Sequence, residues 1–310
     1  MVTRRRLVVG SVAWIAALGL PVRHSHAATW ARGADAPTAR SEVAAAVLDG
    51  RIYVIGGFGG AGRVVEAYDP GRDRWERRAP LPAPLHHTAA AAAGDRILVA
   101  GGYQGGWTAT GAVLAYDPAA DRWEGRRAMP TPRGALAAVA VAGKVYAVGG
   151  AASGRNTQAV EVYDPARDAW RALAPLPTGR DHHAAAEVNG TIYVFGGRVN
   201  GSYARNLAVV EAYDLSADGW APAPPMPTAR SGIGAAAIDG RIYVVGGESP
   251  EGTFAQVEVF DPAANAWRRG PDLPTPRHGL GVVVLAGRVY ALAGGPTPGG
   301  SASAVVEVLA

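Results

Sequence analysis

The 310-residue chain contains no cysteine, which excludes disulfide bonds, thiolate metal ligands and cysteine nucleophiles. It is also almost free of lysine: Lys144 is the single example, so arginine supplies nearly all of the positive charge. No apolar run reaches the ~20 residues that a membrane-spanning helix needs. The longest extends from about Leu7 to Leu20. Thiol chemistry and multiple membrane spans are therefore excluded as functions of this chain.

The first 27 residues have the composition of an export signal. Arginines at positions 4–6 precede the apolar run, and Ser25 and Ala27 have the small-residue spacing of a cleavage site. The order Thr-Arg-Arg-x-Leu resembles a twin-arginine signal. We expect residues 1–27 to direct export to the periplasm or the medium, and residues 28–310 to have no stable membrane insertion. An uncleaved membrane anchor is the alternative.

Most of the positive net charge lies in this leader. The whole chain has 30 basic and 26 acidic residues, and four of the arginines (Arg4, Arg5, Arg6 and Arg23) precede residue 28. The remaining 26 basic residues balance the acidic ones. A balanced chain lacks the basic patch typical of nucleic-acid binding, so we expect no nucleic-acid partner.

Residues 28–310 are repetitive, with a period of about 48 residues. In each repeat a short apolar run ends in two glycines, and a second run ends in an aromatic residue followed by aspartate. A tryptophan stands six residues after that aspartate. The diglycines begin at Gly56, Gly101, Gly149, Gly196, Gly246 and Gly294, and the tryptophans are Trp75, Trp123, Trp170, Trp220 and Trp267. This period, with short strands between turn residues, is typical of propeller blades.

Together these motifs resemble the Kelch-repeat β-propellers, and the resemblance covers essentially all of residues 29–310. It implies an all-β fold of six blades, each with four antiparallel strands around a central channel. Trp30 stands seven residues before Pro37, as Trp75 does before Pro82, whereas the chain ends before a sixth tryptophan would appear. We therefore expect residues 29–36 to form the outer strand that closes the last blade.

An arginine follows the proline by three residues in five of the six repeats. These are Arg40, Arg133, Arg180, Arg230 and Arg277, and Leu85 has the equivalent place in the second repeat. The family places this segment at one mouth of the channel. Two interpretations stay open: the arginines bind an anionic ligand, since guanidinium groups suit carboxylate or phosphate, or they brace the blades through backbone carbonyls.

Histidines gather in the same segments. His86, His182 and His278 belong to alternate blades and are candidate metal ligands or ligand-binding residues, with Asp181 or Glu42 as further ligands. His87 and His183 are their neighbours. Glu187 occupies an inner-strand position that is apolar or alanine in the other repeats, so it is a candidate general acid or base.

Two loops on the expected mouth face carry further candidates. Trp107 lies outside the repeat pattern in one loop, and Tyr203 and Arg205 lie in the other. Exposed aromatic residues on a rigid scaffold are typical binding anchors, for instance for sugar rings, although an aromatic residue can also cap its own loop.

We expect an exported binding module whose mouth holds an anionic or carbohydrate ligand, or an acidic segment of a protein partner. The alternative, which the resemblance implies, is an epimerase or mutarotase for sugar acids of the sialate type, and a metal-dependent enzyme is the third hypothesis. We expect no cofactor. The copper-radical oxidases of this fold need a cysteine and are excluded.

Overall fold

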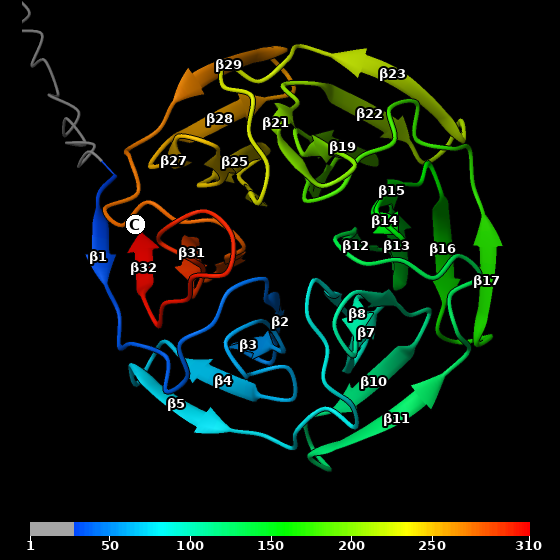
Figure 1. Ribbon diagram of the computed structural model, residues 1–310, viewed down its shortest axis with the longest axis vertical. Helices are drawn as coiled ribbons and strands as arrows, with labels where there is room; N and C mark the ends of the chain where they lie inside the picture. The colour runs from blue at the N-terminus through cyan, green and yellow to red at the C-terminus, as the bar shows by residue number, and fades with distance from the viewer. Residues whose placement is uncertain (1–27) are drawn as a thin grey trace, which may run out of the picture.

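The computed structural model describes residues 28–310; the predicted export signal lies outside this range. Strands and turns, without a helix, make up the described residues. Six four-stranded antiparallel sheets stand around one axis (Figure 1), which confirms the predicted six-bladed propeller. In residues 28–310 there is no helix of the length and hydropathy required to cross a membrane.

Each blade runs from an inner strand at the channel to an outer strand at the rim. The first three blades consist of β2 (Ala44–Leu48), β3 (Arg51–Ile55), β4 (Val65–Asp69) and β5 (Arg74–Arg77); of β6 (Ala89–Ala93), β7 (Arg96–Ala100), β10 (Val113–Asp117) and β11 (Arg122–Arg126); and of β12 (Ala137–Val141), β13 (Lys144–Val148), β16 (Val160–Asp164) and β17 (Ala169–Ala172).

The other three blades consist of β18 (Ala184–Val188), β19 (Thr191–Phe195), β22 (Val210–Asp214) and β23 (Gly219–Ala223); of β24 (Gly234–Ile238), β25 (Arg241–Val245), β28 (Val257–Asp261) and β29 (Ala266–Arg269); and of β30 (Gly281–Leu285), β31 (Arg288–Leu292), β32 (Val306–Leu309) and β1 (Trp30–Arg32). Strand β6 is a run of five alanines. Alanine favours helices, but here the space beside the channel selects small side chains on a strand.

The sixth blade joins the two ends of the described chain. Strand β1 pairs with β32 in antiparallel register, with Trp30 opposite Leu309. The predicted closing strand at residues 29–36 is thus confirmed, although its paired part is only three residues long. The Trp30 indole donates a hydrogen bond of 2.9 Å to the Pro271 carbonyl of blade 5. Strand β1 thereby covers the edge of β32, which would otherwise be unpaired.

The repeat tryptophans and aspartates join neighbouring blades. Each tryptophan indole donates to a carbonyl of the preceding blade, as Trp170 does to Arg127 at 2.9 Å. In blades 1–4 the tyrosine of the Tyr-Asp pair donates to an aspartate five residues later, and that aspartate accepts an N–H from the preceding blade. Tyr163 and Asp168 are one such pair, 2.5 Å apart, and Asp168 accepts from the Arg127 N–H at 2.8 Å. These repeated residues therefore form contacts between neighbouring blades.

The second glycine of each diglycine lies against the backbone of the inner-strand loop. At Gly57 φ is +115°, and a Cβ would lie 2.6 Å from the Ser41 carbonyl oxygen. Blade 6 departs from the expected register by one residue: Ala293 adopts the left-handed conformation of the first glycine, and Gly294 takes the place of the second. Gly295 therefore corresponds to the residue that follows the diglycine elsewhere.

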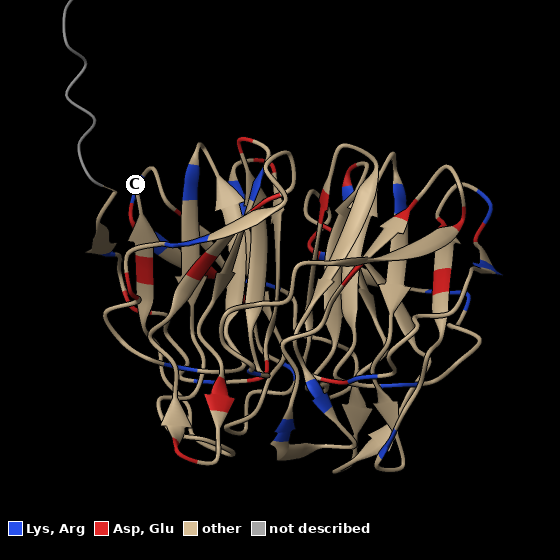
Figure 2. Ribbon diagram, turned by 90° about the horizontal axis from the view of Figure 1, so that it is seen from above, with Lys and Arg blue, Asp and Glu red and all other residues tan. Residues whose placement is uncertain are grey.

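Short two-stranded hairpins extend the loops after the diglycines on one face of the propeller (Figure 2). They are β8 (Tyr103–Gln104) with β9 (Thr108–Ala109), β14 (Ala151–Ala152) with β15 (Arg155–Asn156), β20 (Arg198–Val199) with β21 (Ser202–Asn206), and β26 (Glu248–Ser249) with β27 (Gly252–Thr253). This face is the mouth that carries the candidate residues.

Candidate functional site

The five repeat arginines do not point into the mouth. Each is fully buried, and each forms a salt bridge with a glutamate of its own blade. The pairs are Arg40–Glu66, Arg133–Glu161, Arg180–Glu211, Arg230–Glu258 and Arg277–Glu307. Arg133 also donates to the carbonyls of Gly149 and Ala147, at 2.7 and 3.0 Å. We therefore correct the hypothesis of an arginine ring for anions: the guanidinium groups brace the blades, and no ligand reaches them.

The mouth is built instead on a ring of six residues. Each follows the repeat arginine by two positions, or Leu85 in blade 2. In each of the six blades this residue has a positive φ, and its N–H donates to the carbonyl of the equivalent residue in the preceding blade, except in blade 1, where Val43 donates to Gly279. The ring, which we call the axial ring, consists of Glu42, His87, Ala135, His182, Gly232 and Gly279. Because the backbone is fixed by these bonds, the side chains of the axial ring converge on the channel axis.

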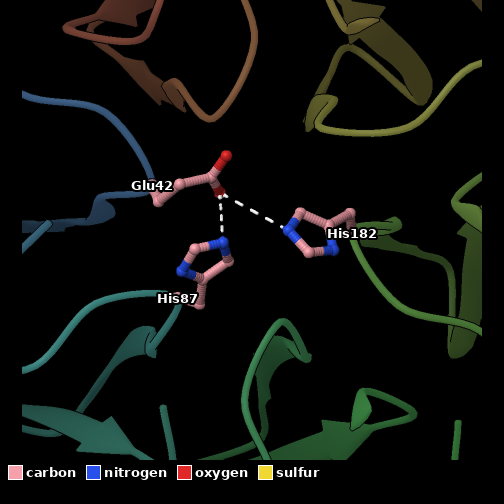
Figure 3. Close-up of side chains that lie close together, drawn as sticks. All are labelled: Glu42, His87 and His182. Atoms are coloured by element: carbon pink, nitrogen blue, oxygen red, sulfur yellow. Dashed lines mark ion pairs between the residues drawn. The ribbon is translucent and has the colours of Figure 1, made fainter. Parts of the chain in front are cut away.

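Glu42 is the centre of this convergence (Figure 3). Its carboxylate lies 3.4 Å from His87 Nε2 and 4.0 Å from His182 Nε2, with His278 Nε2 at 3.4 Å on the other oxygen. Burial opposes ionisation, but the positive charge of the imidazoles, when they are protonated, and of Arg198 outweighs it and lowers the pKa of Glu42 to about 2. Glycine is required opposite, because a Cβ on Gly279 would lie 2.6 Å from Glu42 Oε1.

His87 presents a defined nitrogen to Glu42. Behind it, His86 Nε2 faces the Gly106 carbonyl at 2.7 Å and therefore donates. His86 Nδ1 then accepts from His87 Nδ1, also at 2.7 Å, which leaves the lone pair of His87 on Nε2. Burial lowers the pKa of His87 well below its usual value, so this ring is neutral at neutral pH. His86 thus orients His87 and does not itself line the mouth cavity described below.

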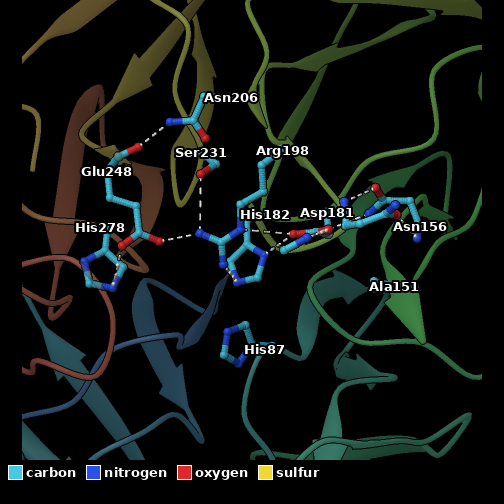
Figure 4. A network of polar contacts seen from close by, with 12 residues as sticks. His87, Ala151, Asn156, Asp181, His182, Arg198, Asn206, Ser231, Glu248 and His278 are labelled. Carbon is cyan, nitrogen blue, oxygen red and sulfur yellow. Dashed lines mark hydrogen bonds and ion pairs between the residues drawn. The ribbon is translucent and has the colours of Figure 1, made fainter. Parts of the chain in front are cut away.

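Arg198 organises the other side of the site (Figure 4). It donates to Glu248 Oε1 at 2.7 Å and to Asp181 Oδ1 at 3.2 Å, and its Nη2 lies 2.9 Å from His182 Nε2. A guanidinium group only donates, so His182 Nε2 accepts and His182 Nδ1 donates to Asp181 at 2.6 Å. The pKa of Asp181 is lowered, because these hydrogen bonds outweigh the effect of burial. Arg198 therefore neutralises part of the negative charge of Glu42, Asp181 and Glu248. We call these residues, with His87, His182 and Arg198, the floor of the site.

A cavity of about 310 Å³ opens above this floor. Its polar lining comes from Glu42, His87, Arg198 and Glu248, and its aromatic lining from Phe58, Trp107 and Tyr203; Gly59, Gly299 and Gly300 complete it. The Trp107 side chain is 61% exposed, and its ring centre lies 5.6 Å from that of Phe58. We call this space the mouth cavity. A smaller cavity of about 90 Å³ continues below it along the axis, past His182 and His183.

Comparison with known proteins agrees with this architecture. A model of the Kelch-repeat domain of KLHDC2, KLHL20 and DRC7 matches residues 135–306, and a Kelch motif model matches residues 39–82 and 84–130. This chain belongs to the Kelch-repeat family. No curated protein sequence matches it significantly. The solved structure of YjhT is similar to this Kelch propeller with a TM-score of 0.76 and 16% sequence identity, covering 88% of this chain and 96% of that one. At this identity the likeness shows the fold alone.

Several predicted site residues of this Kelch propeller lie away from the cavity. Glu187, the candidate acid or base, accepts the Gly190 N–H at 2.6 Å in the hairpin at the far end of β18, and we correct that hypothesis. Arg205 is exposed on β21 and does not line the cavity. His183 is buried beside Val148, with Nε2 3.1 Å from the Val148 carbonyl oxygen. His278 faces Glu42 and Glu248, as well as the Gly299 carbonyl at 2.9 Å.

Arg198 and Glu248 were not predicted as site residues. Both occupy the position directly after the second glycine of their repeats, where the other blades have Phe58, Tyr103, Ala151 and Gly295. The residue at this position forms a bridge with the loop of the axial ring in blades 2–6, so its side chain stands beside the channel. A comparison of the repeats at this position alone would have found the polar floor, because its residue type changes from blade to blade.

Proposed function

We propose that the mouth cavity binds a small neutral carbohydrate. The observation that carries this proposal is the exposed Trp107 indole, which stands with Phe58 and Tyr203 over a floor of paired carboxylates, imidazoles and a guanidinium group. Sugars present an apolar C–H face that packs on an aromatic ring and hydroxyl groups that both donate and accept hydrogen bonds. The mouth cavity offers both aromatic rings for the apolar face and polar groups for the hydroxyl groups.

The charge of the floor favours a neutral ligand over an anionic one. Arg198 already pairs with Glu248 and Asp181, and Glu42 is ionised with a pKa of about 2. A ligand carboxylate would therefore meet more negative than positive groups. The buried repeat arginines offer no compensation. The same negative charge disfavours an acidic peptide segment as ligand. The burial of the arginines disfavours a sugar-acid epimerase that would hold its substrate through them.

The size of the cavity indicates a ligand of one or two sugar units. At about 310 Å³ it lies at the lower end of the range for small-molecule sites, which begins at roughly 300 Å³. The aromatic residues line the open side and the polar residues the base. We therefore expect a ring at the end of a glycan, or a free sugar, rather than an internal segment of a long chain.

The experiment is a glycan-array screen of the protein, followed by titration calorimetry with the best neutral and acidic sugars. We expect neutral sugars to bind and Trp107→Ala to weaken them at least tenfold, whereas Trp107→Phe, which keeps an aromatic face, retains most of the affinity. The matched control is Arg205→Ala, on the hairpin that carries Tyr203 but outside the cavity, which leaves the affinity unchanged. Binding that is confined to acidic sugars or acidic peptides, or that survives Trp107→Ala, would overturn the proposal.

We also propose that the protein acts after export. The basic, apolar and small-residue order of residues 1–27 supports this proposal. N-terminal sequencing of the protein from the periplasm and the medium tests it, with Ala28 expected as the first residue. Full-length protein that stays in the cytoplasm would contradict export.

A further inference from the structure

We propose that Glu42, His87 and His182 form a binding site for a divalent metal ion of the zinc class, at the constriction between the mouth cavity and the channel. These residues come from blades 1, 2 and 4 and occupy equivalent positions of the axial ring. One ligand atom from each, Glu42 Oε2 and the two Nε2 atoms, lies within 4.8 Å of the others. The proposal does not depend on the sugar ligand.

The Glu42–His87 contact is the first argument. Glu42 Oε2 and the lone pair of His87 Nε2 face one another at 3.4 Å, and no N–H or O–H donor of the described residues stands between them. Two acceptors at this distance repel one another unless a proton on Nε2 or a metal ion lies between them, and a metal ion would bind both atoms. Ligands about 2.0–2.1 Å from a tetrahedral zinc ion are about 3.3 Å apart, so the observed separation fits two ligands of one ion.

The groups behind the two imidazoles are the second argument. His87 Nδ1 donates to His86, and His182 Nδ1 donates to Asp181. Histidine ligands of metals usually donate their other ring N–H in this way, since the second contact fixes both the tautomer and the ring orientation. His87 therefore directs its Nε2 lone pair toward Glu42, and the Nε2 lone pair of His182 accepts the hydrogen bond from Arg198. The carboxylate behind His182 raises the basicity of that ligand in addition.

Arg198 is the group that a metal ion would displace. Its Nη2 donates to His182 Nε2, but its other nitrogens hold Glu248, Asp181 and Ser231, so the side chain stays anchored when this one bond is lost. The nearby positive charge weakens the metal site without abolishing it, because Glu42, Asp181 and Glu248 surround it. A third imidazole, His278, belongs to a second candidate group with Glu42 and Glu248. In that group the protein's own donors already satisfy Glu248, at Arg198 and the Gly299 N–H.

Two nitrogen ligands and one carboxylate suit zinc, and this set leaves a fourth position open for water or a ligand. Glu42 and His87 also line the mouth cavity, so that position is accessible from it. The site differs from the set predicted from the sequence, because His86 supports His87 from behind and His278 lies outside the group.

The test uses the whole protein after treatment with a chelator. Equilibrium dialysis with Zn²⁺ is expected to give one ion per chain with a dissociation constant below about 10 μM. Substitution with Co²⁺ is expected to give the visible absorption of a tetrahedral site. Glu42→Gln and His87→Gln should each weaken Zn²⁺ binding at least 100-fold. The melting temperature of each variant without metal reports whether it is folded, and His87→Gln serves alone if Glu42→Gln unfolds.

Glu251→Gln, in the exposed turn between β26 and β27, is the matched control, because it neutralises a carboxylate of the mouth face outside the cavity and leaves the three proposed ligands in place. It should leave the Zn²⁺ affinity unchanged. Loss of binding in Glu248→Gln with retention in His87→Gln would overturn the proposed ligand set. Absence of stoichiometric Zn²⁺ binding to the folded protein would overturn the site itself.

Discussion

Blades 2 and 3 are neighbours with the same fold, yet they fill the same interior position with opposite chemistry. Blade 3 has Arg133 and Glu161, joined at 2.5 Å, with Thr131 also donating to the glutamate. Blade 2 has Ala83, Leu85 and Leu114 at the three equivalent positions, and the two leucines belong to one apolar cluster. All three polar residues are therefore replaced together.

The arginine and the glutamate of this ion pair are therefore kept or replaced together. A buried charge without its partner costs several kcal/mol, whereas a well-packed apolar set of similar volume costs nothing comparable. A repeat can therefore keep the whole set or lose the whole set, but a blade with one member alone would be unstable. The arginine is a structural part of each blade, and its near-regular recurrence reflects that role.

The largest effect should come from breaking the pair in blade 3. Glu161→Leu leaves the Arg133 guanidinium buried without a carboxylate, and we expect a loss of about 3–5 kcal/mol in the free energy of unfolding. Urea unfolding measures it. The control is Glu124→Leu, which removes a glutamate paired with Arg126 at the surface and should cost less than about 1 kcal/mol. A cost below that of the control would contradict the brace.

The reciprocal change introduces half of the pair into blade 2. Leu114→Glu places a carboxylate beside Leu85 without a partner, and we expect a loss of about 2–3 kcal/mol. Adding Leu85→Arg should recover part of that loss in the double variant, because the positions of the blade 3 pair are then reproduced. A double variant less stable than Leu114→Glu would show that other residues of blade 2 no longer accommodate the ion pair. Thermal and urea unfolding of all three proteins provide the comparison.

Blade 5 offers a milder version of the same contrast. It has Phe260 and Asn265 where blade 3 has the hydrogen-bonded Tyr163 and Asp168. Tyr163→Phe should cost about 1 kcal/mol, the net value of one hydrogen bond. Burial and Asp168 raise the pKa of Tyr163, so the unfolded chain loses the phenol proton first and stability falls as the pH rises above 10. Alkaline unfolding curves should therefore be flatter for Tyr163→Phe; an identical pH dependence would count against this linkage.

The smallest effect should come from converting blade 3 fully to the blade 2 type. The triple variant Thr131→Ala, Arg133→Leu and Glu161→Leu removes both charges and the hydroxyl that accompanies them. We expect its free energy of unfolding to lie within about 1 kcal/mol of the wild type, far from the Glu161→Leu value. If the triple variant were as unstable as Glu161→Leu, the ion pair would itself stabilise the fold relative to an apolar set, which would contradict this expectation.

The repeat pattern was sufficient for the fold because each repeated residue makes the same local contact in most of the six blades. Trp30 could be assigned to the closing strand from its spacing alone. The direction of the arginine side chains could not be predicted in this way. Their partner glutamates lie 26–31 residues away in sequence, and only the folded sheet brings them together. Their joint absence in blade 2 was nevertheless visible in the sequence.

The site was harder to predict than the fold because it consists of departures from the repeat. His182 and Trp107 were found as irregular residues, but Glu42 was considered only as a supporting ligand. Sequence proximity made His86 and His87 look equivalent. One position along the chain separates His87, which belongs to the axial ring, from His86 behind it. The left-handed backbone conformation at His87 decides which of the two imidazoles reaches the channel axis.

The three-residue strand β1 makes the sixth blade the place where this ring of sheets can open most easily. Local unfolding begins where few backbone bonds must break, and here the two chain ends meet without a covalent link. Gly279 and Gly299, which line the two axial cavities, belong to that blade. Occupancy of the mouth and protection of β1 from hydrogen exchange are consequently linked: whatever binds at the centre of the propeller should slow exchange at its outermost strand.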